Sequence, residues 1–516
     1  AIYLIIALIG LSAPSCSDSM LDFSPTDSGS GKELLKSAST AITSVNGVYR
    51  SMWTAGWSTT ANTHQCFGIA AYNLALDCMA DDLIMQSQGN GWFWGDHCYN
   101  VKSNYTSSAF RSYDVWYANY KWIANVNYII DAEPEMAGTE ADVAYVAGQA
   151  YAIRALCYLN LATWFSRAPY NSLTGASRWN EPCVPVYTTG TSIDTGGQPR
   201  ESLRTVYGRI DQDIDRAIEL LEKARETTLA ENNKSHINLY VALGIKSRAC
   251  LAEGDWDGAF KAAKRVIDEG GYAVGTKSDL TGGMNSLDKQ NVMWGAGIQV
   301  ADQAGGYAGF FTHMDNKEGA YAKSAPKLIS KQLYNRISAT DIRRDWWDPS
   351  DKESPYVSKK FSFANVASFL GDYIYMRVEE MYFTAAEAAL RLDDLKSARE
   401  LMNTVMAERD PGYSANNRSG TLLGATTTTW TGSFLENILT HRRIELWGEY
   451  GRLFDVRRLG QGIDRRTDDG FSEECISMMN RRNVNITKAD TYDWVLTIPK
   501  AELDANPNIN EEDQNP

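Results

Sequence analysis

The stretch DYIYMRVEEMYFTAAEAALRLDDLKSARELMNTVMAER, residues 372–409, decides the fold that the sequence predicts. Apolar side chains recur at steps of three and four in two runs, 378–392 and 395–406, which is the period of an amphipathic helix. Asp393 and Asp394 separate the two runs and are typical of a turn and a helix N-cap. The stretch therefore predicts two helices joined by a short turn, an αα-hairpin.

A second stretch, 139 residues earlier, repeats this plan. Residues 239–267 contain two helical runs, and Gly254 and Asp255 stand at the turn between them. Each hairpin has about the size of one tetratricopeptide unit, and such a unit buries its apolar face only by stacking on others. The pattern favours a stack of helical hairpins, while two unrelated helical pairs in a helix-rich protein remain the alternative.

Composition narrows the class of protein. The chain has 516 residues, of which 44% are hydrophobic and 22% charged, as in an ordinary folded protein. Its net charge of −14 and its lack of basic runs argue against a nucleic-acid partner. The 15 Trp and 27 Tyr are an excess of aromatic residues, and we expect some of them on a recognition surface.

The first residues have the character of a secretion signal. Residues 1–13 form an apolar run that is too short to span a bilayer and has the length of a signal-peptide core. Cys16 follows directly, as at a bacterial lipoprotein site whose thiol becomes acylated; an incidental Cys in a plain secreted protein is the alternative. We expect residues 1–15 to be a signal peptide that lacks its beginning, and residues 16–31 to be a flexible, lipid-anchored tether.

The rest of the chain, residues 32–516, is predicted to form one domain. Its helical scaffold is expected over residues 32–269 and 374–460. Residues 270–373 are rich in Gly, Ser, Asn and aromatics, and predict an irregular ligand-binding lobe with short strands at 292–294 and 373–375.

The other seven cysteines contain no Cys-x-x-Cys pair, so a structural zinc site is not expected. Cys157 and Cys250 lie on apolar helix faces and are expected in the core. A disulfide among Cys66, Cys78 and Cys98 is compatible with an oxidising compartment, but spacing leaves its pairing open.

Five blocks of sequence, in order along the chain, resemble one family. The strongest is HRRIELWGEYGRLFDVRRLG, residues 441–460, which is similar to the ER-x-x-EL-x-x-EG-x-R-x-FD-x-x-R block of the SusD/RagB family. These proteins are nutrient-binding outer-membrane lipoproteins of Bacteroidetes. Residues 119–127, 199–213, 373–387 and 498–516 resemble further blocks of that family. The chain departs from the pattern at His441, where Glu is common, at Tyr450, which intervenes before Gly451, and at residues 166–169.

The resemblance implies a mainly α fold, with about four tetratricopeptide-like helix pairs and a large irregular lobe. It implies a lipid-anchored protein exposed on the outer membrane, with a SusC-like TonB-dependent transporter as its partner. The usual ligand of the family is an oligosaccharide, although some members bind peptides. We expect no cofactor; the five histidines show no metal-ligand spacing, and calcium binding stays open.

The charged residues of the family blocks are expected to have a structural role. They lie on or beside predicted helices, where ion pairs between stacked helices explain them better than ligand contacts do. They are Arg377, Glu380, Glu387, Arg443, Glu445, Arg452 and Asp455.

Loop aromatics are the better candidates for ligand contact, because sugar rings pack on aromatic faces while amides and carboxylates bond the hydroxyls. The first candidate group is Asn90, Trp92, Phe93, Trp94 and Asp96; the second is Tyr307, Phe310 and Phe311. The alternative is that these rings fill the core of the lobe, which is the expectation for Trp346 and Trp347.

The rival functions are an enzyme, such as a glycoside hydrolase, and a bare protein-binding scaffold. A hydrolase needs two carboxylates about 5–10 Å apart that flank one bond. The pairs Asp81-Asp82 and Glu379-Glu380 are sequence neighbours, whose side chains diverge, and a dyad from distant positions stays open. No Gly-x-Ser-x-Gly motif or phosphate-binding glycine loop is present, and the long aromatic-rich insertion argues against a bare scaffold. The sequence predicts surface capture of a ligand without chemistry.

Overall fold

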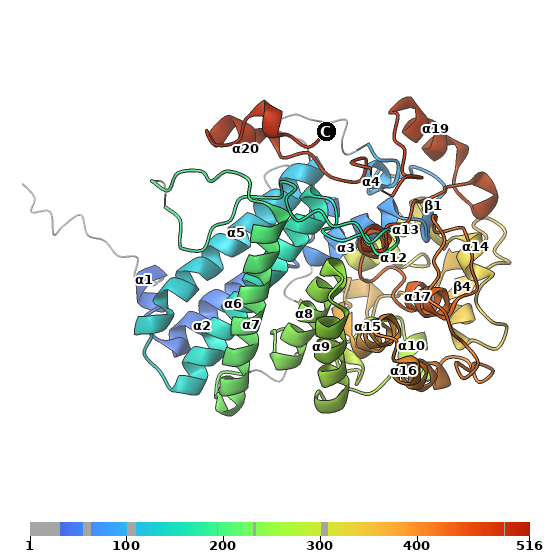
Figure 1. Cartoon of the computed structure of the whole chain (residues 1–516). Coiled ribbons are helices and arrows are strands. Elements are labelled where there is room, and N and C mark those ends of the chain that lie inside the picture. The colour runs from blue at the N-terminus through green and yellow to red at the C-terminus, as the bar shows by residue number, and fades with distance from the viewer. Residues whose placement is uncertain are drawn as a thin grey trace, which may run out of the picture.

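The computed structural model describes residues 31–54, 63–100, 110–192, 194–230, 234–300, 308–489 and 491–516. Long helices fill one half of the molecule, and short helices, strands and loops form a lobe beside them (Figure 1). The predicted signal peptide, Cys16, most of the tether and Tyr307 lie outside the described residues. Within the described ranges, no helix combines the length and apolar character that a membrane span requires.

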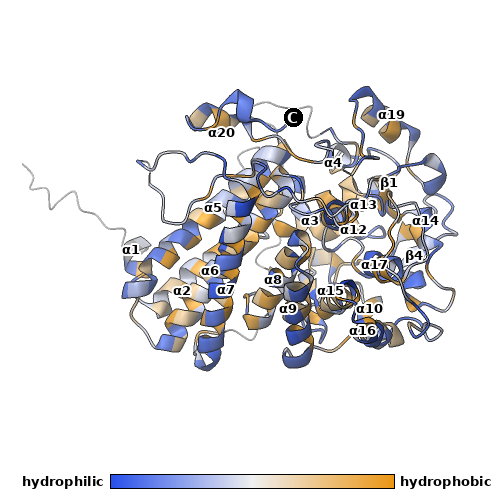
Figure 2. Ribbon diagram, viewed as in Figure 1, coloured by the Kyte–Doolittle hydropathy of each residue, from blue (hydrophilic) through white to orange (hydrophobic). Residues whose placement is uncertain are grey.

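Six of the long helices come from the first 270 residues, and α5, α6 and α7 pack side by side (Figure 1). Their bounds are α2 (Ala38–Ser51), α5 (Phe110–Ala132), α6 (Glu140–Phe165), α7 (Leu203–Lys223), α8 (Leu239–Glu253) and α9 (Trp256–Glu269). Hydrophilic and hydrophobic residues alternate along α7 and α9, as amphipathic helices require (Figure 2). Side-chain oxygens of Thr139, Ser202 and Asn238 accept backbone N–H groups at the starts of α6, α7 and α8.

The two hairpins predicted from the sequence are confirmed. The second consists of α15 (Val378–Arg391) and α16 (Leu395–Ala407). Asp394 caps α16 by accepting the Ser397 N–H, and Asp255 caps α9 by accepting the Gly258 N–H, each at 3.0 Å. Because α15 also packs against α9, the hairpins stack although they are distant in sequence. The pairs α2–α5, α6–α7, α8–α9 and α15–α16 give the four tetratricopeptide-like pairs.

The lobe contains two small sheets. The two short strands that the sequence predicts are present as β2 (Val292–Ala296) and β6 (Tyr373–Arg377). They pair antiparallel, and β6 leads directly into α15. The other sheet has the order β1-β3-β5-β4. Its strands are β1 (Leu83–Met85), β3 (Lys327–Ile329), β5 (Val357–Ser358) and β4 (Trp347–Asp348). Strand β1 comes from the segment between α2 and α5, so this lobe also uses chain from the first hundred residues.

Short helices lie in the lobe, in the C-terminal region and, in the case of α1, beside α2. They are α1 (Gly31–Leu34), α4 (Trp94–His97), α10 (Lys277–Thr281), α12 (Phe310–Met314), α13 (Ala320–Ser324), α14 (Lys331–Tyr334), α19 (Glu473–Arg481) and α20 (Lys500–Ala505). The predicted helix over 434–450 is α17 (Phe434–Glu445), which is separated from α18 (Arg452–Leu459) by Gly448 and Gly451. Both glycines have positive φ, of 75° and 91°, which ends the helical run.

Helix α3 (Ile69–Met79) lies within residues 56–98, whose sequence shows little helical period. The structure explains why: 10 of its 11 residues are buried, on every side of the helix. A helix that is apolar all round has no hydrophobic stripe from which periodicity could reveal it.

The charged family residues form buried ion pairs, as predicted. The Glu445 carboxylate accepts hydrogen bonds from Arg377 at 2.9 Å, Arg409 at 2.9 Å and Arg343 at 3.1 Å, and all four side chains are fully buried. Burial alone would raise the pKa of Glu445, but the three guanidinium groups lower it well below its ordinary value. The other pairs are Arg248–Glu380, Arg458–Glu387, Arg442–Asp455, Arg443–Asp82 and Arg452–Asp81.

His441 fits this network although it departs from the family pattern. Arg343 donates to its Nδ1 at 2.9 Å, and a guanidinium group cannot accept, so that nitrogen of His441 is the acceptor. Burial, followed by the charge of Arg343, lowers the pKa of His441 well below its ordinary value. A neutral imidazole thus replaces an acidic side chain at this position.

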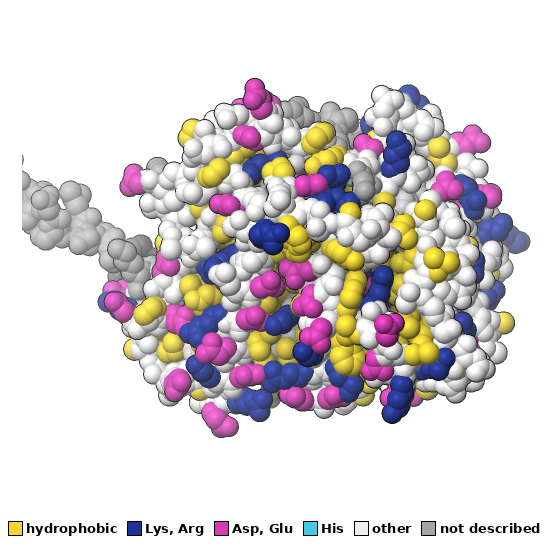
Figure 3. Space-filling model, in the orientation of Figure 1, with side chains coloured by type: hydrophobic (Ala, Val, Ile, Leu, Met, Phe, Trp, Pro, Cys, Tyr) yellow, Lys and Arg dark blue, Asp and Glu magenta, His cyan; other side chains and the backbone are white. Residues whose placement is uncertain are grey.

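The core predictions for tryptophan and cysteine can also be compared with the structure. Trp346 and Trp347 are each 2% exposed, and Cys157 and Cys250 are buried, as expected. Cys66, Cys78 and Cys98 are buried, and no disulfide joins the cysteines of the described ranges. On the surface, basic and acidic side chains are interspersed over the helical half (Figure 3).

A candidate ligand-binding site at the loop of residues 88–96

A polar pocket of about 200 Å³ lies between the loop of residues 88–96 and the start of α5. Amide, carboxylate, guanidinium and aromatic side chains line it together. The lining residues are Gln65, Gln88, Gly91, Trp94, Gly95, Asp96, Asn100, Phe110 and Arg111. Ligand pockets are commonly about 300–1,000 Å³, so this one has room for one end of a ligand rather than a long chain.

A buried ion pair holds the pocket together. Arg111 binds Asp96 with both ends of its guanidinium group, Nε to Oδ1 at 2.8 Å and Nη2 to Oδ2 at 2.9 Å. Arg111 also donates to the Gln65 backbone carbonyl at 3.2 Å, and the Gln65 side chain accepts the Phe93 N–H at 2.8 Å. Burial would lower the pKa of Arg111, but Asp96 raises it above its ordinary value. Asp96 is thus committed to positioning the loop.

Glycines let this loop approach its neighbours closely. Gly89 has a φ of +50°, and a Cβ there would lie 2.5 Å from the carbonyl oxygen of Ser324 and 2.8 Å from Cβ of Ala325. Gly91 has a φ of +87°, and the loop closes with its N–H on the Gln88 carbonyl at 2.8 Å. The loop therefore rests on the end of α13 in one defined shape.

The structure places some residues of the first predicted group, the aromatic and polar residues 90–96, at the surface and others in the interior. Asn90 is exposed and Trp92 is half-buried. Trp94 is only 3% exposed but lines the pocket, and its indole N–H has no hydrogen-bond partner among the described residues. Phe93 is fully buried against Phe67, which differs from the predicted ligand contact. Its apolar ring supports the site from beneath.

Trp92 belongs to an aromatic cluster beside the pocket. Its ring stacks on His64, with centroids 4.7 Å apart and planes 14° apart, and meets Tyr321 edge-on at 6.0 Å. The Tyr321 hydroxyl lies 2.5 Å from His64 Nδ1, which fixes both rings. Because Gly91 lines the pocket and Trp92 follows it, this aromatic surface adjoins the polar pocket.

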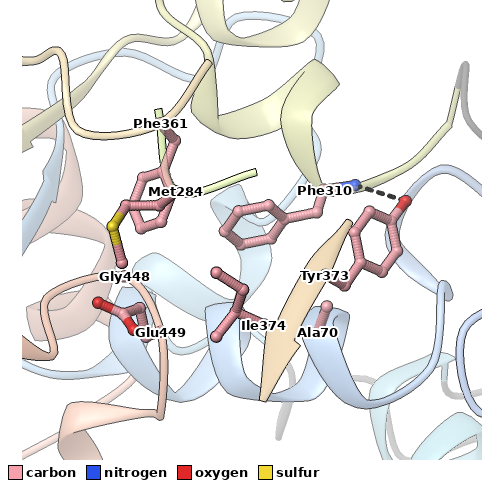
Figure 4. A pocket seen from close by; sticks show the side chains of 8 residues that line it. All are labelled: Ala70, Met284, Phe310, Phe361, Tyr373, Ile374, Gly448 and Glu449. Atoms are coloured by element: carbon pink, nitrogen blue, oxygen red, sulfur yellow. Dashed lines mark hydrogen bonds between the residues drawn. The ribbon is translucent and has the colours of Figure 1, made fainter. Parts of the chain in front are cut away.

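In the second predicted group, Phe310 and Phe311 are buried and do not have the exposed position that was predicted for ligand contact. Phe310 is 8% exposed and Phe311 is 2% exposed. Figure 4 shows Phe310 among Phe361, Ile374 and Tyr373, around an internal cavity of about 10 Å³, and its N–H donates to the Tyr373 hydroxyl at 3.2 Å. Apolar rings at the start of α12 gain more from this burial than from solvent, so both fill the core of the lobe. Tyr307 lies outside the described residues.

Sequence reasoning missed several residues that build the site. Gln65, Gln88, Asn100 and Arg111 line the pocket, and Tyr321 belongs to the aromatic cluster. They come from separate segments and share no motif, so nothing local marks them. The one usable signal was Arg111, a charged residue in the first turn of a helix that is rich in aromatic residues.

The carboxylate pairs considered for hydrolysis are all buried in ion pairs. Asp81 and Asp82 both contact Arg443 and Arg452. Although burial alone would raise the pKa of Asp81, these arginines lower it to about 2. Glu379 and Glu380 are buried and paired as well. In the part of the chain that the structure covers, no group of three His, Cys, Asp or Glu side chains could hold a metal ion.

Solved structures share this fold over nearly the whole chain. A SusD-like carbohydrate-binding protein from Bacteroides vulgatus matches with a TM-score of 0.74 at 24% identity, covering 92% of this chain and 98% of its own. A SusD superfamily protein from Bacteroides thetaiotaomicron matches with a TM-score of 0.73 at 22% identity, covering 93% and 100%. Surface glycan-binding protein A from Bacteroides uniformis matches with a TM-score of 0.65 at 16% identity, covering 92% and 99%. At these identities the likeness is one of fold.

Sequence models of families give the closer assignment. The model of the SusD family matches residues 322–516. A SusD-like model described as starch-binding and associating with the outer membrane matches residues 40–251. No curated protein has a significantly similar sequence. The two models together match most of the chain, and the chain belongs to the SusD family.

Proposed function

We propose that this protein captures an oligosaccharide at the cell surface and delivers it to a SusC-like TonB-dependent transporter in the outer membrane. Membership of the SusD family and the match to a starch-binding, outer-membrane-associated family model support this proposal. The structural relatives named above as carbohydrate- or glycan-binding agree with it. Acylation of Cys16 would tether the protein to the membrane on which the transporter lies.

One observation carries the choice of ligand: a polar pocket and an aromatic surface adjoin on a single fixed loop. A sugar ring has apolar C–H faces and a rim of hydroxyls, so it is complementary to both surfaces at once. In this proposal Trp92 receives the face of a ring. Asn90, Gln88 and Asn100 supply amides for its hydroxyls, and Trp94 supplies an indole N–H. Asp96 and Arg111 hold these groups in place.

The proposed activity is binding without turnover. The adjacent carboxylate pairs are buried among arginines, so they do not flank a bond in this pocket. Within the pocket, the Asp96 carboxylate already accepts two hydrogen bonds from Arg111. A hydrolase would need a second, opposing carboxylate about 5–10 Å from the first.

Isothermal titration calorimetry of the chain from Ser17 onward tests this proposal. The ligands are a panel of oligosaccharides and a panel of short peptides, and the sugars are recovered afterwards for chromatography. Saturable heat with intact sugar is the expected result. Cleaved sugar would instead identify a glycoside hydrolase, and heat with peptides alone would identify a peptide-binding member of the same kind of uptake system.

A further inference from the structure

A second groove, of about 460 Å³, lies on the helical half of the molecule. It runs between the middle of α5, the side chains of Tyr187, Thr191, Ser192 and Thr195, and Glu502 of α20, which lies over α5 in Figure 1. The groove shares no lining residue with the pocket at the loop of residues 88–96. Its volume falls within the range of about 300–1,000 Å³ that is usual for ligand sites.

The floor of the groove consists of aromatic rings held in fixed positions. Trp116, Tyr117 and Tyr120 recur at helical spacing on one face of α5. The rings of Trp116 and Tyr120 lie 4.8 Å apart, and Tyr120 meets Tyr187 edge-on at 5.9 Å. The Tyr120 hydroxyl donates to the Pro185 carbonyl at 2.7 Å. Tyr117 and Tyr120 are half-buried, so ring surface is available to a ligand.

The rim of the groove is polar on both sides. One side presents the hydroxyls of Thr191, Ser192 and Thr195. The other presents Glu502, whose Oε2 accepts from Trp116 Nε1 at 3.3 Å and whose Oε1 accepts from Asn506 at 2.8 Å. A carboxylate has about four lone-pair sites, so Glu502 can still accept from a ligand.

The hydroxyl-bearing segment is held in place from below. Asn127 of α5 donates to the carbonyl of Thr189 at 2.9 Å, and Arg154 of α6 donates to that of Thr188 at 2.8 Å. Asp131 accepts the Gly190 N–H at 2.7 Å. Two helices thus fix the height of the rim over the aromatic floor. The groove exists before a ligand arrives, which lowers the entropy cost of binding.

We propose that this groove is a second carbohydrate-binding site, which takes one or two uncharged sugar rings. Tyr117 and Tyr120 receive the C–H faces, and the rim groups bond the hydroxyls. Lys121 and Glu502 are the charged side chains of the lining and have opposite signs, so the groove favours a neutral ligand. A purely apolar ligand would leave the rim hydroxyls and the carboxylate without partners at a cost. The proposal is independent of the loop site and goes beyond the function proposed above.

Calorimetry with separate variants of the two sites tests this inference. The probes are gluco-, xylo- and manno-oligosaccharides of two to six units, titrated into the chain from Ser17 onward. We expect two classes of site in the unmodified protein. Trp92→Ala should leave the groove class intact, and Tyr117→Ala should weaken it about five- to thirtyfold, since one ring contact is lost. Tyr117→Phe, which keeps the ring, should bind much as the unmodified protein does.

Tyr240→Ala is the matched control, because Tyr240 is a half-buried tyrosine on α8 outside both sites. Far-UV circular dichroism confirms that each variant is folded. If Trp92→Ala abolishes all sugar binding and Tyr117→Ala changes none, the groove proposal is wrong and the loop site stands. If Tyr117→Ala alone abolishes binding, the groove is the sugar site and the loop assignment is wrong. If no sugar binds the unmodified protein, both proposals fail.

Discussion

The ion-pair network around Glu445 and the pocket around Arg111 both contain buried arginine–carboxylate pairs, but the two regions differ in what surrounds those pairs. At Glu445, three guanidinium groups surround one carboxylate, and all are fully buried. At the pocket, the single pair Arg111–Asp96 is buried, while Asn90, Gln88 and Trp92 around it reach the surface. The charged groups of the network form their hydrogen bonds with one another, whereas the pocket leaves amides and an aromatic ring available to a ligand. Charged residues that form sequence blocks in this protein therefore report on the fold, and neutral residues without a motif form the candidate site.

The largest expected effect comes from removing the centre of the network. Glu445→Ala leaves Arg343, Arg377 and Arg409 buried without their shared carboxylate, and breaking a buried pair costs about 3–5 kcal/mol. We expect the free energy of unfolding, measured by urea titration with circular dichroism, to fall by at least that amount, or the variant not to fold.

Asp257→Asn is the control, because its pair with Lys261 is largely exposed at 59% and 73%. Exposed pairs contribute about 0.2–1 kcal/mol, so this variant should be nearly as stable as the unmodified protein. Equal stability of the two variants would show that the Glu445 network is not structural.

The next prediction concerns Asp77, a buried carboxyl on α3 that has no arginine side chain bonded to it. Its Oδ1 accepts the Arg452 N–H at 2.7 Å, and burial raises its pKa to about 8. The folded protein therefore keeps a proton that the unfolded chain loses near pH 4. Stability should fall as pH rises between these values, by about 1.4 kcal/mol per pH unit from this group.

Asp77→Asn should remove that slope, because the amide does not titrate. The measurement is the difference in unfolding free energy between the unmodified protein and the variant, from pH 5 to 7. This window lies above the range in which Asp81, whose pKa is lowered to about 2, loses its own contribution. A difference that stays constant across the window would mean that Asp77 is ionised in the folded protein.

The third prediction addresses the site. Trp92→Ala removes a half-buried ring and should lower sugar affinity by about 1–2 kcal/mol, with a smaller effect on stability than Glu445→Ala. Calorimetry and urea titration measure the two quantities on the same sample. Trp256→Ala, a half-buried tryptophan at the start of α9, should leave the affinity unchanged. Equal affinities for the two variants would place the sugar site away from Trp92.

The smallest effects on stability are expected from the N-caps of the two hairpins, α8–α9 and α15–α16. Asp255→Ala and Asp394→Ala each remove one N-cap hydrogen bond of 3.0 Å, which costs about 1 kcal/mol. Because the two caps have the same geometry, the losses should agree and should leave sugar affinity unchanged. A much larger loss at one of them, by urea titration, would show that the two hairpins are not equivalent parts of the scaffold.

The local sequence pattern was sufficient to predict much of the helical scaffold. Helical period and the turn residues Asp255 and Asp394 predicted the hairpins, because α9, α15 and α16 are amphipathic and each cap is set by neighbours in sequence. Glu445 on α17 and Asp455 on α18 are buried, as expected for charged residues that pair between helices. The same reasoning could not predict helix α3, because this helix is buried on all sides and has no hydrophobic stripe.

The site depended on contacts between distant segments. The sequence singled out Trp92 and Asn90, but it could not separate them from Phe93, Phe310 and Phe311, which are buried. Whether an aromatic ring faces solvent or core is decided by what packs above it.

The sequence by itself determined an acidic protein, a stack of helical hairpins and a structural role for its charged blocks, since net charge and helical period are read from the residues and their near neighbours in sequence. Tertiary structure alone decided the binding surfaces. It brought Gln65 and Arg111 to the loop of residues 88–96, and it placed Glu502 beside Trp116, 386 residues away. Side chains so far apart in the chain share a surface only after the core between them has formed.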